Sequence, residues 1–502
     1  MNKIARLPFL FRVVLAFVAG VFGALGQAPF DLPIALLLAL TIAFMLWRQE
    51  ENRPGALGWA FGTGYFALAL VWIVEPFQVD AARHGWMAPF ALLFLSTGLA
   101  MFWAAAFRFA KALGPSTFGL VLCWTGAELM RAYVLTGFPW ANPAQIAIAG
   151  PLSIMLSWVG PHGVTLALLS LAAVLSIPAN PRGGMSLWLG QGALLAAGAL
   201  ALSLPHARDP VAKTENRVRL VQPNAAQHLK WQPEMAQVFY ARQLEYTKAP
   251  PLPSEPEPDL IVWPETAIPW RLETAAPVLA EIAKAAGDAS VALGALRYDG
   301  QHLYNALAVV APDGRLAATY DKHHLVPFGE YMPLADLFEG LGIGALAASA
   351  GRFAGGPGPA ILDLGALGKA LPLICYEAVF AHDVNAMPER VDFLLQVTND
   401  AWFGVYAGPQ QHLAQARMRA IEQGLPLLRA ANTGISAVID PTGRMVASLP
   451  LNEAGFIDAW LPTALPATLY SKVGDWPVAA LTFLVLFINR VLTLRTRIGV
   501  RN

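Results

Sequence analysis

Seven apolar stretches crowd the first 205 residues, and they constrain the fold of this chain more than any other feature. A helix needs about 20 mostly apolar residues to cross the hydrocarbon core of a bilayer. The apolar stretches lie at roughly 9–26, 33–47, 56–75, 88–107, 117–135, 152–177 and 185–204, and an eighth lies near 475–493. We therefore expect a membrane α-helical bundle of about eight spans.

Charged residues are unevenly distributed along the chain. Residues 1–205 contain 10 Lys and Arg and 6 Asp and Glu, whereas residues 206–502 contain 24 and 28. The mean hydropathy of +0.48 is high for a globular protein, so the charge must gather outside the membrane. We expect a transmembrane bundle of about seven spans at 1–205, an extramembrane domain at 206–472, and a C-terminal span with a basic tail at 473–502.

The Lys and Arg residues indicate how the bundle is oriented. With the N-terminus inside, the short outer loops carry only Arg83, while the inner segments carry twelve Lys and Arg residues. Loops rich in Lys and Arg stay in the cytoplasm. We therefore expect a multi-pass protein whose 206–472 domain lies on the outer face of the membrane and whose basic tail is cytoplasmic.

Two ionisable residues of the fifth apolar stretch share a helix face. Glu128 and Arg131 lie three positions apart, a spacing that brings side chains together on one helix. Ionisable groups inside a membrane are usually paired or face protein. The two residues either form an ion pair with each other or bind a lipid head group.

Short β-like runs alternate with helical stretches in the outer domain. Strands are expected at 218–222, 259–263, 290–294, 306–310 and 437–439, and amphipathic helices at 275–286 and 410–423. Pro312-Asp313-Gly314 is a strong turn signal after the fourth of these strands. This alternation predicts an α/β sandwich.

Cys375 is one of only two cysteines in the chain. It follows the apolar run Ala370–Ile374, which reads as a buried strand ending in a polar elbow. A buried thiol is commonly an inert core residue. However, extracellular domains tend to pair their cysteines, and the other cysteine, Cys123, lies in a membrane stretch. Cys375 is therefore either inert or a nucleophile.

Two further candidates follow predicted strands. Glu265 ends Trp263-Pro264-Glu265, and Lys322 opens a stretch rich in His, Phe and Tyr. A glutamate after proline is commonly a surface or capping residue, and a single lysine is commonly solvated. Yet α/β folds place reactive groups at the carboxyl ends of strands, and a thiolate nucleophile needs a base and a cation nearby.

The order Glu265, Lys322, Cys375 resembles the nitrilase superfamily. Over essentially the whole chain, the apolar N-terminal part, the outer domain and the last span resemble the apolipoprotein N-acyltransferase family. The stretches that carry this resemblance are 136–140 (TGFPW), 263–266 (WPET), 322–331 (KHHLVPFGEY), 375–377 (CYE) and 398–404 (TNDAWFG).

The resemblance implies an αββα nitrilase-like sandwich and a role for each site residue. Glu265 would be the general base, Lys322 would stabilise the oxyanion, and Cys375 would be the nucleophile. The supporting residues would be Glu330, Glu377 and Tyr376. The residues that shape the substrate pocket would be Trp231, Asn305, Trp402 and Trp140.

The resemblance also implies the reaction. An acyl chain would pass from a phospholipid to Cys375 as a thioester, and then to the N-terminal amine of a diacylglyceryl-modified apolipoprotein. This is the last step of bacterial lipoprotein maturation, on the periplasmic face of the inner membrane. We expect no cofactor, and we expect a monomer that contacts membrane lipid.

Other functions are weighed against this one. A membrane-tethered nitrilase-like amidase would keep the same three residues but need no lipid substrate. A lipid-binding or transport protein would need no enzyme chemistry at all. The nine histidines include the adjacent pair His323-His324 but no H-E-x-x-H pattern, so no metal site is expected. The net charge of zero argues against nucleic acid as a partner.

Overall fold

The structure is a computed structural model that describes residues 7–114, 116–177, 192–198, 200–201, 210–333 and 353–499. The chain divides into two compact units. Unit 1 comprises residues 1–208, 406–414 and 468–502, and unit 2 comprises residues 209–405 and 415–467. Each unit is described by itself.

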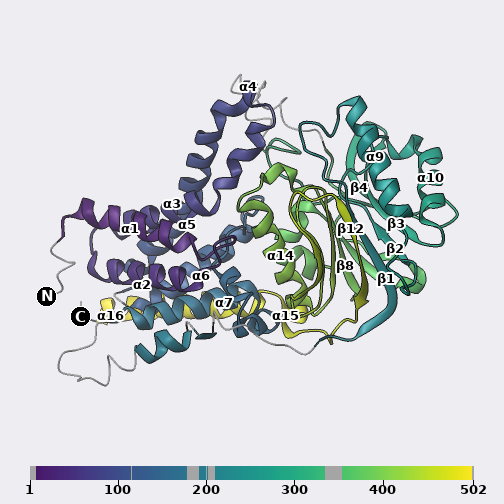
Figure 1. Ribbon diagram of the computed structural model, residues 1–502. Helices are drawn as coiled ribbons and strands as arrows, with labels where there is room; N and C mark the ends of the chain where they lie inside the picture. The colour runs from purple at the N-terminus through teal and green to yellow at the C-terminus, as the bar shows by residue number, and fades with distance from the viewer. Residues whose placement is uncertain are drawn as a thin grey trace. The chain divides into compact units, whose positions relative to one another are not determined.

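Unit 1 is helical (Figure 1). Its longer helices are α1 (Phe9–Ala24), α2 (Pro33–Gln49), α3 (Pro54–Ala69), α5 (Ala88–Leu113), α6 (Thr117–Tyr133), α7 (Ile154–Leu175) and α16 (Trp476–Gly499). Shorter helical pieces are η2 (Val71–Gln78), α4 (Ala81–His84), η3 (Gly85–Met87), η4 (Pro143–Ala147), η5 (Pro151–Ser153) and α15 (Leu469–Val473). Residues 192–198 and 200–201 are also helical.

The expected count of eight spans is not confirmed. Within the described ranges, two helical segments are long and apolar enough to cross a membrane, Ala81–Leu113 and Pro151–Leu175. A third joins α3 to η2 across a bend of 48°. Other apolar helices are shorter because turns and prolines interrupt them: α1 has 16 residues and α2 has 17. The stretch expected at 185–204 lies largely outside the described residues.

Glycines allow α1 and α3 to pack closely. A Cβ on Gly20 of α1 would collide with the carbonyl oxygen of Phe61, and a Cβ on Gly64 of α3 would collide with that of Phe17. Small residues of this kind let two helix backbones approach within an apolar environment. The contact is therefore set by backbone shape rather than by large side chains.

Glu128 and Arg131 form the mutual pair that their spacing allows. The Arg131 Nη2 and Glu128 Oε2 atoms lie 2.6 Å apart, and both side chains are fully buried. Trp103 Nε1 donates to Glu128 Oε1 at 2.7 Å, and Asn142 Nδ2 donates to Oε2 at 3.2 Å. The guanidinium also donates to the Trp140 carbonyl at 2.8 Å. The structure shows the ion-pair alternative, and both residues also hydrogen-bond to neighbouring protein groups.

Unit 2 contains two six-stranded sheets with the same order of pairings. The first sheet has the order β12-β1-β2-β3-β4-β5 and the second β6-β7-β8-β9-β10-β11. In each, the successive pairs are antiparallel, parallel, parallel, antiparallel and antiparallel. Strand β1 contacts β9 and β10, and β4 contacts β7, so the sheets are stacked.

The strands of unit 2 lie close to their expected positions. The first sheet comprises β1 (Lys213–Gln222), β2 (Leu260–Val262), β3 (Ser290–Asp299), β4 (His302–Val310), β5 (Leu316–Asp321) and β12 (Gly455–Pro462). The second comprises β6 (Leu362–Asp363), β7 (Lys369–Ile374), β8 (Phe393–Thr398), β9 (Leu427–Ala431), β10 (Ser436–Ile439) and β11 (Met445–Leu449). The expected turn at Pro312-Asp313-Gly314 joins β4 to β5, because Ala311 N–H donates to the Arg315 carbonyl.

Helices cover the outer faces of the sandwich. Figure 1 shows α9 (Pro233–Lys248) and α10 (Ala276–Ala286) against the first sheet. Figure 1 also shows α14 (Gly408–Gln423), whose residues 415–423 belong to unit 2, beside the second sheet. Gln423 at its end donates to Asn385 of α13 (Ala381–Asn385). These elements confirm the predicted α/β sandwich and both predicted helices.

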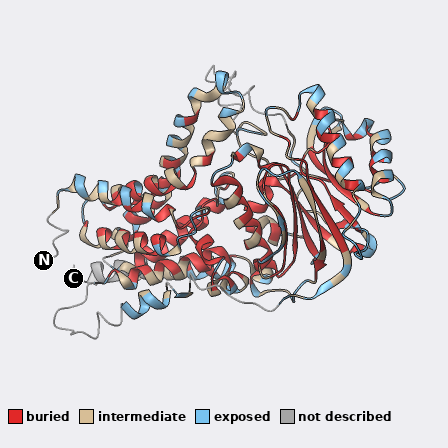
Figure 2. Cartoon of the chain, viewed as in Figure 1, coloured by how far each residue is buried: buried red, intermediate tan, exposed pale blue. Residues whose placement is uncertain are grey.

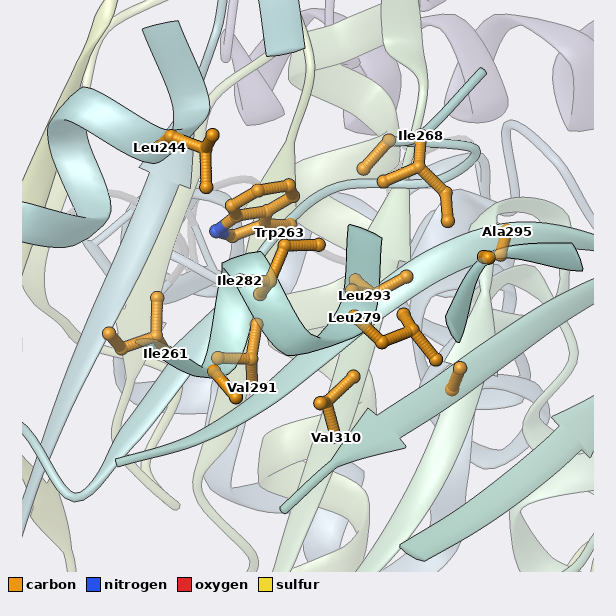
Figure 3. Close-up of a cluster of buried hydrophobic side chains, with 14 of the residues drawn as sticks. Leu244, Ile261, Trp263, Ile268, Leu279, Ile282, Val291, Leu293, Ala295 and Val310 are labelled. Carbon is orange, nitrogen blue, oxygen red and sulfur yellow. The ribbon is translucent and has the colours of Figure 1, made fainter. Parts of the chain in front are cut away.

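An apolar cluster fixes the first sheet to its two helices. Figure 3 shows Ile261, Val291 and Val310 of the sheet facing Leu279 and Ile282 of α10. Strand residues buried on both faces appear as continuous red ribbons in Figure 2, while the outer sides of α9 and α10 are exposed. Strands covered on both sides read as unbroken apolar runs, which is why short sequence runs located them.

Candidate active site

Cys375 is the first residue after strand β7 and opens the 3-10 helix η9 (Cys375–Val379). Its φ of 51° lies in the left-handed region that residues other than glycine seldom adopt. The carbonyl of Cys375 accepts a hydrogen bond from Gln396 Nε2 at 3.2 Å. The predicted strand and elbow are both present. Such backbone outliers gather at functional sites, and here the turn holds a side chain that is 5% exposed.

Glu265 follows β2 through Trp263 and Pro264, and its side chain is buried. Its Oε1 accepts from Asn305 Nδ2 at 2.6 Å, and its Oε2 accepts from the Asn399 backbone N–H at 2.8 Å. One donor comes from β4 and the other follows β8. The carboxylate is therefore held at both oxygens by elements of both sheets.

Lys322 is the first residue after β5 and is 1% exposed. Its Nζ lies 2.9 Å from Oε1 and 2.8 Å from Oε2 of Glu330. Its backbone N–H donates to the Asn305 carbonyl at 2.8 Å, and its own carbonyl accepts from Gly356 N–H at 2.8 Å. A buried ammonium needs such a carboxylate partner, and Glu330 supplies it.

Asn305 links the two carboxylates. Its Nδ2 donates to Glu265 Oε1 and also reaches Glu330 Oε1 at 3.2 Å. Its Oδ1 is buried and has no hydrogen-bond partner among the residues that the structure describes. The side chain thus holds Glu265 and Glu330 in place, in addition to the pocket role expected for it.

The three candidate catalytic groups act on one another electrostatically. Burial raises the pKa of the Cys375 thiol, Glu265 raises it further, and the Lys322 ammonium opposes them. Burial likewise raises the pKa of Glu265, against the effect of Lys322. For Lys322, burial favours the neutral amine, but Glu330 and Glu265 outweigh it and raise the pKa. These effects favour a neutral Cys375 thiol and a charged Lys322 ammonium, and they make the Glu265 carboxylate a stronger base.

Glu377 accepts hydrogen bonds from the backbone that leads to Cys375 and from the backbone that follows Lys322. Its carboxylate accepts from Ile374 N–H at 2.7 Å, His323 N–H at 2.8 Å and Tyr320 Oη at 2.8 Å. These donors flank Cys375 on one side and Lys322 on the other. Glu377 thus acts on Lys322 through the backbone that follows it, whereas the Lys322 ammonium is paired with Glu330.

The aromatic residues expected at the pocket lie in three settings. Tyr376 is buried and packs edge-on against Phe380, with ring centroids 4.8 Å apart. Trp231 and Trp402 are 46% and 40% exposed, so both can meet a substrate. Trp140 belongs to unit 1, where it is buried and donates through Nε1 to Gln411 Oε1 at 2.7 Å. Their pocket roles stay predictions.

A group of possible metal-ligating atoms lies beside Glu377. His323, His324 and Asp383 each bring one ligand atom within 4.8 Å of the others. The His324 Nδ1 and Asp383 Oδ2 atoms are already 2.6 Å apart, and His323 Nδ1 lies 2.7 Å from Glu377 Oε1. The histidines are thus already paired with the two acids, and we assign them no ion. No sequence motif links Asp383 to this histidine pair.

Two contacts of Glu265 could not be predicted from the sequence. The Asn399 donor is a backbone N–H, so its side-chain identity carries no information. Lys230 is buried, and its Nζ donates to the Glu265 carbonyl at 3.0 Å and to Thr266 Oγ1 at 2.9 Å. It stands beside Trp231 in the sequence. A small pocket adjoins it, lined also by Trp231, Thr266 and Asn432.

Comparison with known families agrees with this arrangement of sheets and side chains. Residues 217–466 match the sequence model of the Carbon-nitrogen hydrolase family. Residues 19–174 match that of the Apolipoprotein N-acyltransferase N-terminal domain. Unit 2 is therefore a carbon–nitrogen hydrolase domain, the class to which nitrilase-like sandwiches belong.

Relatives over the full length define the family further. Apolipoprotein N-acyltransferases of Bradyrhizobium diazoefficiens and Caulobacter vibrioides are each 38% identical to this chain, covering 98% and 97% of it and 96% and 94% of their own lengths. That of Rhodopseudomonas palustris is 36% identical over 95% of this chain and 94% of its own. The chain belongs to the apolipoprotein N-acyltransferase family, as its motifs predict.

A CN-hydrolase superfamily protein from Xanthomonas campestris aligns with 52% of this chain and 95% of its own, at 22% identity and a TM-score of 0.36.

Proposed function

We propose that this protein is an enzyme that transfers an acyl chain from a phospholipid to the N-terminal amine of a diacylglyceryl-modified apolipoprotein, the final step of bacterial lipoprotein maturation. The observation that carries this proposal is the meeting of Glu265, Lys322 and Cys375 at strand ends in one buried site. Full-length membership of the apolipoprotein N-acyltransferase family supports the choice of substrates. No cofactor enters the reaction.

In the first half-reaction, Glu265 takes the proton of the Cys375 thiol while the sulfur attacks an ester carbonyl of the phospholipid. The raised pKa of Glu265 makes it a stronger base, and the raised pKa of the thiol keeps it neutral until that proton moves. The ester C–O bond then breaks. The leaving lysophospholipid alkoxide takes the proton from Glu265, and the acyl group stays on Cys375 as a thioester.

In the second half-reaction, the neutral α-amine of the acceptor attacks the thioester carbonyl. Glu265 takes a proton from the attacking nitrogen, and the C–S bond breaks as the amide forms. The released thiolate regains the proton from Glu265, so the enzyme returns to its starting state. The two half-reactions together make a ping-pong mechanism.

Each tetrahedral intermediate carries a developing negative charge on its oxygen. The Lys322 ammonium is placed to meet that charge, because Glu330 anchors it beside Cys375. A backbone N–H near Tyr376 at the start of η9 is the second proposed donor. Loss of one such donor typically raises the barrier by about 3–4 kcal/mol.

We propose that the protein is a monomer and a multi-pass protein of the bacterial inner membrane. Residues 1–205 and 473–502 would form its membrane part, and residues 206–472 a periplasmic catalytic domain. The apolar helices and the placement of Lys and Arg support this orientation. Both lipid substrates diffuse in the bilayer, so a membrane-held catalytic domain meets them in two dimensions. Exclusion of water would protect the thioester from hydrolysis.

The covalent step can be tested with the full-length protein in detergent. Purified enzyme is incubated with phosphatidylethanolamine alone, and intact mass spectrometry measures the added acyl mass. We expect one acyl group on Cys375 that is released when a diacylglyceryl-cysteine peptide is added. Cys375→Ala should carry no acyl group and should transfer none.

The second cysteine supplies a matched control. Cys123 lies in α6 of unit 1, and Cys123→Ala should acylate and transfer like the wild type. Transfer by Cys375→Ala, or hydrolysis of small amides without phospholipid turnover, would contradict the proposal. The orientation is tested separately with Ser254→Cys in a Cys123→Ala background, since Ser254 is exposed in a loop. An impermeant maleimide should label it in spheroplasts without lysis.

A further inference from the structure

Lys230 is a buried lysine that the mechanism above does not use. It is 7% exposed, and no carboxylate oxygen accepts from its Nζ among the hydrogen bonds of the described residues. Instead, Nζ donates to the Glu265 carbonyl and the Thr266 hydroxyl. Burying an ammonium without a direct ion pair is unfavourable. Accordingly, burial lowers the pKa of Lys230 to about 8, although Glu265 opposes that effect.

The peptide that Lys230 holds is the turn that presents the Glu265 side chain. Thr266 has a φ of 45°, which a β-branched residue rarely adopts. The turn packs so closely on Gly294 of β3 that a Cβ there would meet Thr266 N and Glu265 Cα. The Ala267 N–H donates to the Gly294 carbonyl at 2.7 Å, and Gln243 Nε2 donates to the Ala267 carbonyl at 2.9 Å. Lys230 therefore completes the support of a strained turn.

Several charged groups act on the Glu265 carboxylate. Lys322 and Glu330, which follow β5, act with opposite signs, and the Cys375 thiol faces it from the end of β7. Lys230, which precedes α9, adds a second cation. Among these, Lys322 is already paired with Glu330, whereas Lys230 interacts with the backbone of the base itself.

We propose that Lys230 is a positioning residue for the general base: its ammonium fixes the Glu265–Thr266 turn and favours the ionised carboxylate. This inference rests on the proposed function only in taking Glu265 as the base. Removal of the ammonium should misplace the carboxylate and favour its protonated form. Transfer should then slow, and it should need a higher pH.

The test compares variants of the full-length enzyme with phosphatidylethanolamine and a diacylglyceryl-cysteine peptide as substrates. For Lys230→Met we expect kcat to fall about tenfold or more, as misplacement of a catalytic group does. In a plot of kcat/KM against pH, the acid limb is the range in which kcat/KM falls as the pH is lowered. This acid limb should move to higher pH. Lys230→Gln keeps a donor without the charge, so it should move the acid limb with a smaller loss of kcat. Thr266→Val keeps the ammonium and should leave the limb in place.

The exposed Lys284 of α10 provides the control, since Lys284→Met should change neither kcat nor the acid limb. If Lys230→Met does not fold, Lys230→Gln alone decides the question through the position of the limb. A wild-type acid limb in the Lys230 variants would overturn the inference. That result leaves the proposed function intact as long as Cys375→Ala remains inactive. A KM increase for phospholipid at unchanged kcat and pH profile would also overturn it.

Discussion

The Lys322 ammonium is 2.8 Å from the nearer carboxylate oxygen of Glu330, and only 1% of the Lys322 side chain is exposed. The two lie eight positions apart in the sequence, and the backbone N–H of Val326 also donates to Glu330 Oε2 at 2.8 Å. The loop after β5 thus contains both members of this ion pair, and a backbone hydrogen bond to Glu330 within the loop holds the carboxylate in place. This pair keeps a cation next to the thiol, where an oxyanion would form.

Neutralising Glu330 should damage both stability and activity. Glu330→Gln leaves the buried Lys322 ammonium without its direct counter-charge, and removal of one partner of a buried pair costs about 3–5 kcal/mol. We expect a lower melting temperature and at least about a tenfold loss of kcat. The control is Glu389→Gln, because the Glu389–Lys369 pair is exposed and such pairs contribute little. Equal behaviour of the two variants would contradict the role of Glu330.

The pH dependence of transfer should follow the ionisation of the Glu265–Cys375 pair. Glu265 accepts a proton only when ionised, so kcat/KM should fall as the pH is lowered through its apparent pKa. Because burial raises the pKa of Glu265, this fall should occur above the ordinary glutamate value of about 4.3. Asn305→Leu removes a hydrogen bond that favours the ionised carboxylate, and it should move the limb to higher pH. A limb at the ordinary glutamate pKa in the wild type would contradict this account.

Gly294 should tolerate no side chain. In Gly294→Ala the new Cβ meets Thr266 N, Glu265 Cα and the Pro264 carbonyl, and overpacking of this kind typically costs about 1–3 kcal/mol. We expect a lower melting temperature and slower acylation of Cys375. Gly455→Ala in β12 of the same sheet is the control, since its nearest neighbour would lie at 3.5 Å. Normal acylation kinetics in Gly294→Ala would show that the turn can shift without loss.

His323 should make stability depend on pH. Burial alone would lower the pKa of His323, but Asp383 and Glu377 outweigh it and raise that pKa to about 9. A raised pKa stabilises the fold fully below the unfolded value of about 6.5, and this stabilisation is lost as the pH rises through about 9. The expected loss is on the order of 1–3 kcal/mol.

Thermal unfolding at pH 6 and pH 9.5 tests this linkage. The melting temperature of the wild type should fall more between these values than that of His323→Asn, which lacks the titrating group. The exposed His302 provides the control, and His302→Gln should keep the wild-type dependence. Identical pH dependence in His323→Asn and the wild type would show that the histidine does not hold its proton in the way described.

Local sequence patterns predicted most of the strands and helices of unit 2, and they singled out Glu265, Lys322 and Cys375. The apolar runs before Glu265 and Cys375 predicted β2 and β7, because a strand buried on both faces must be apolar at successive positions. The order of Glu265, Lys322 and Cys375 carried the family resemblance. The span count was less reliable, since apolar composition does not reveal where a helix bends, as it does between Ala69 and Val71.

The neighbours of those residues were decided by tertiary structure. Asn399 contacts Glu265 across 134 positions of sequence, and Asn305 contacts it across 40. Sequence alone determined which residues stand at strand ends, because that depends on local apolar periodicity. Only the pairing and stacking of the two sheets decided that Asn305 bridges two carboxylates and that Lys230 supports the base, because hydrogen bonds depend on distances between segments that are remote along the chain.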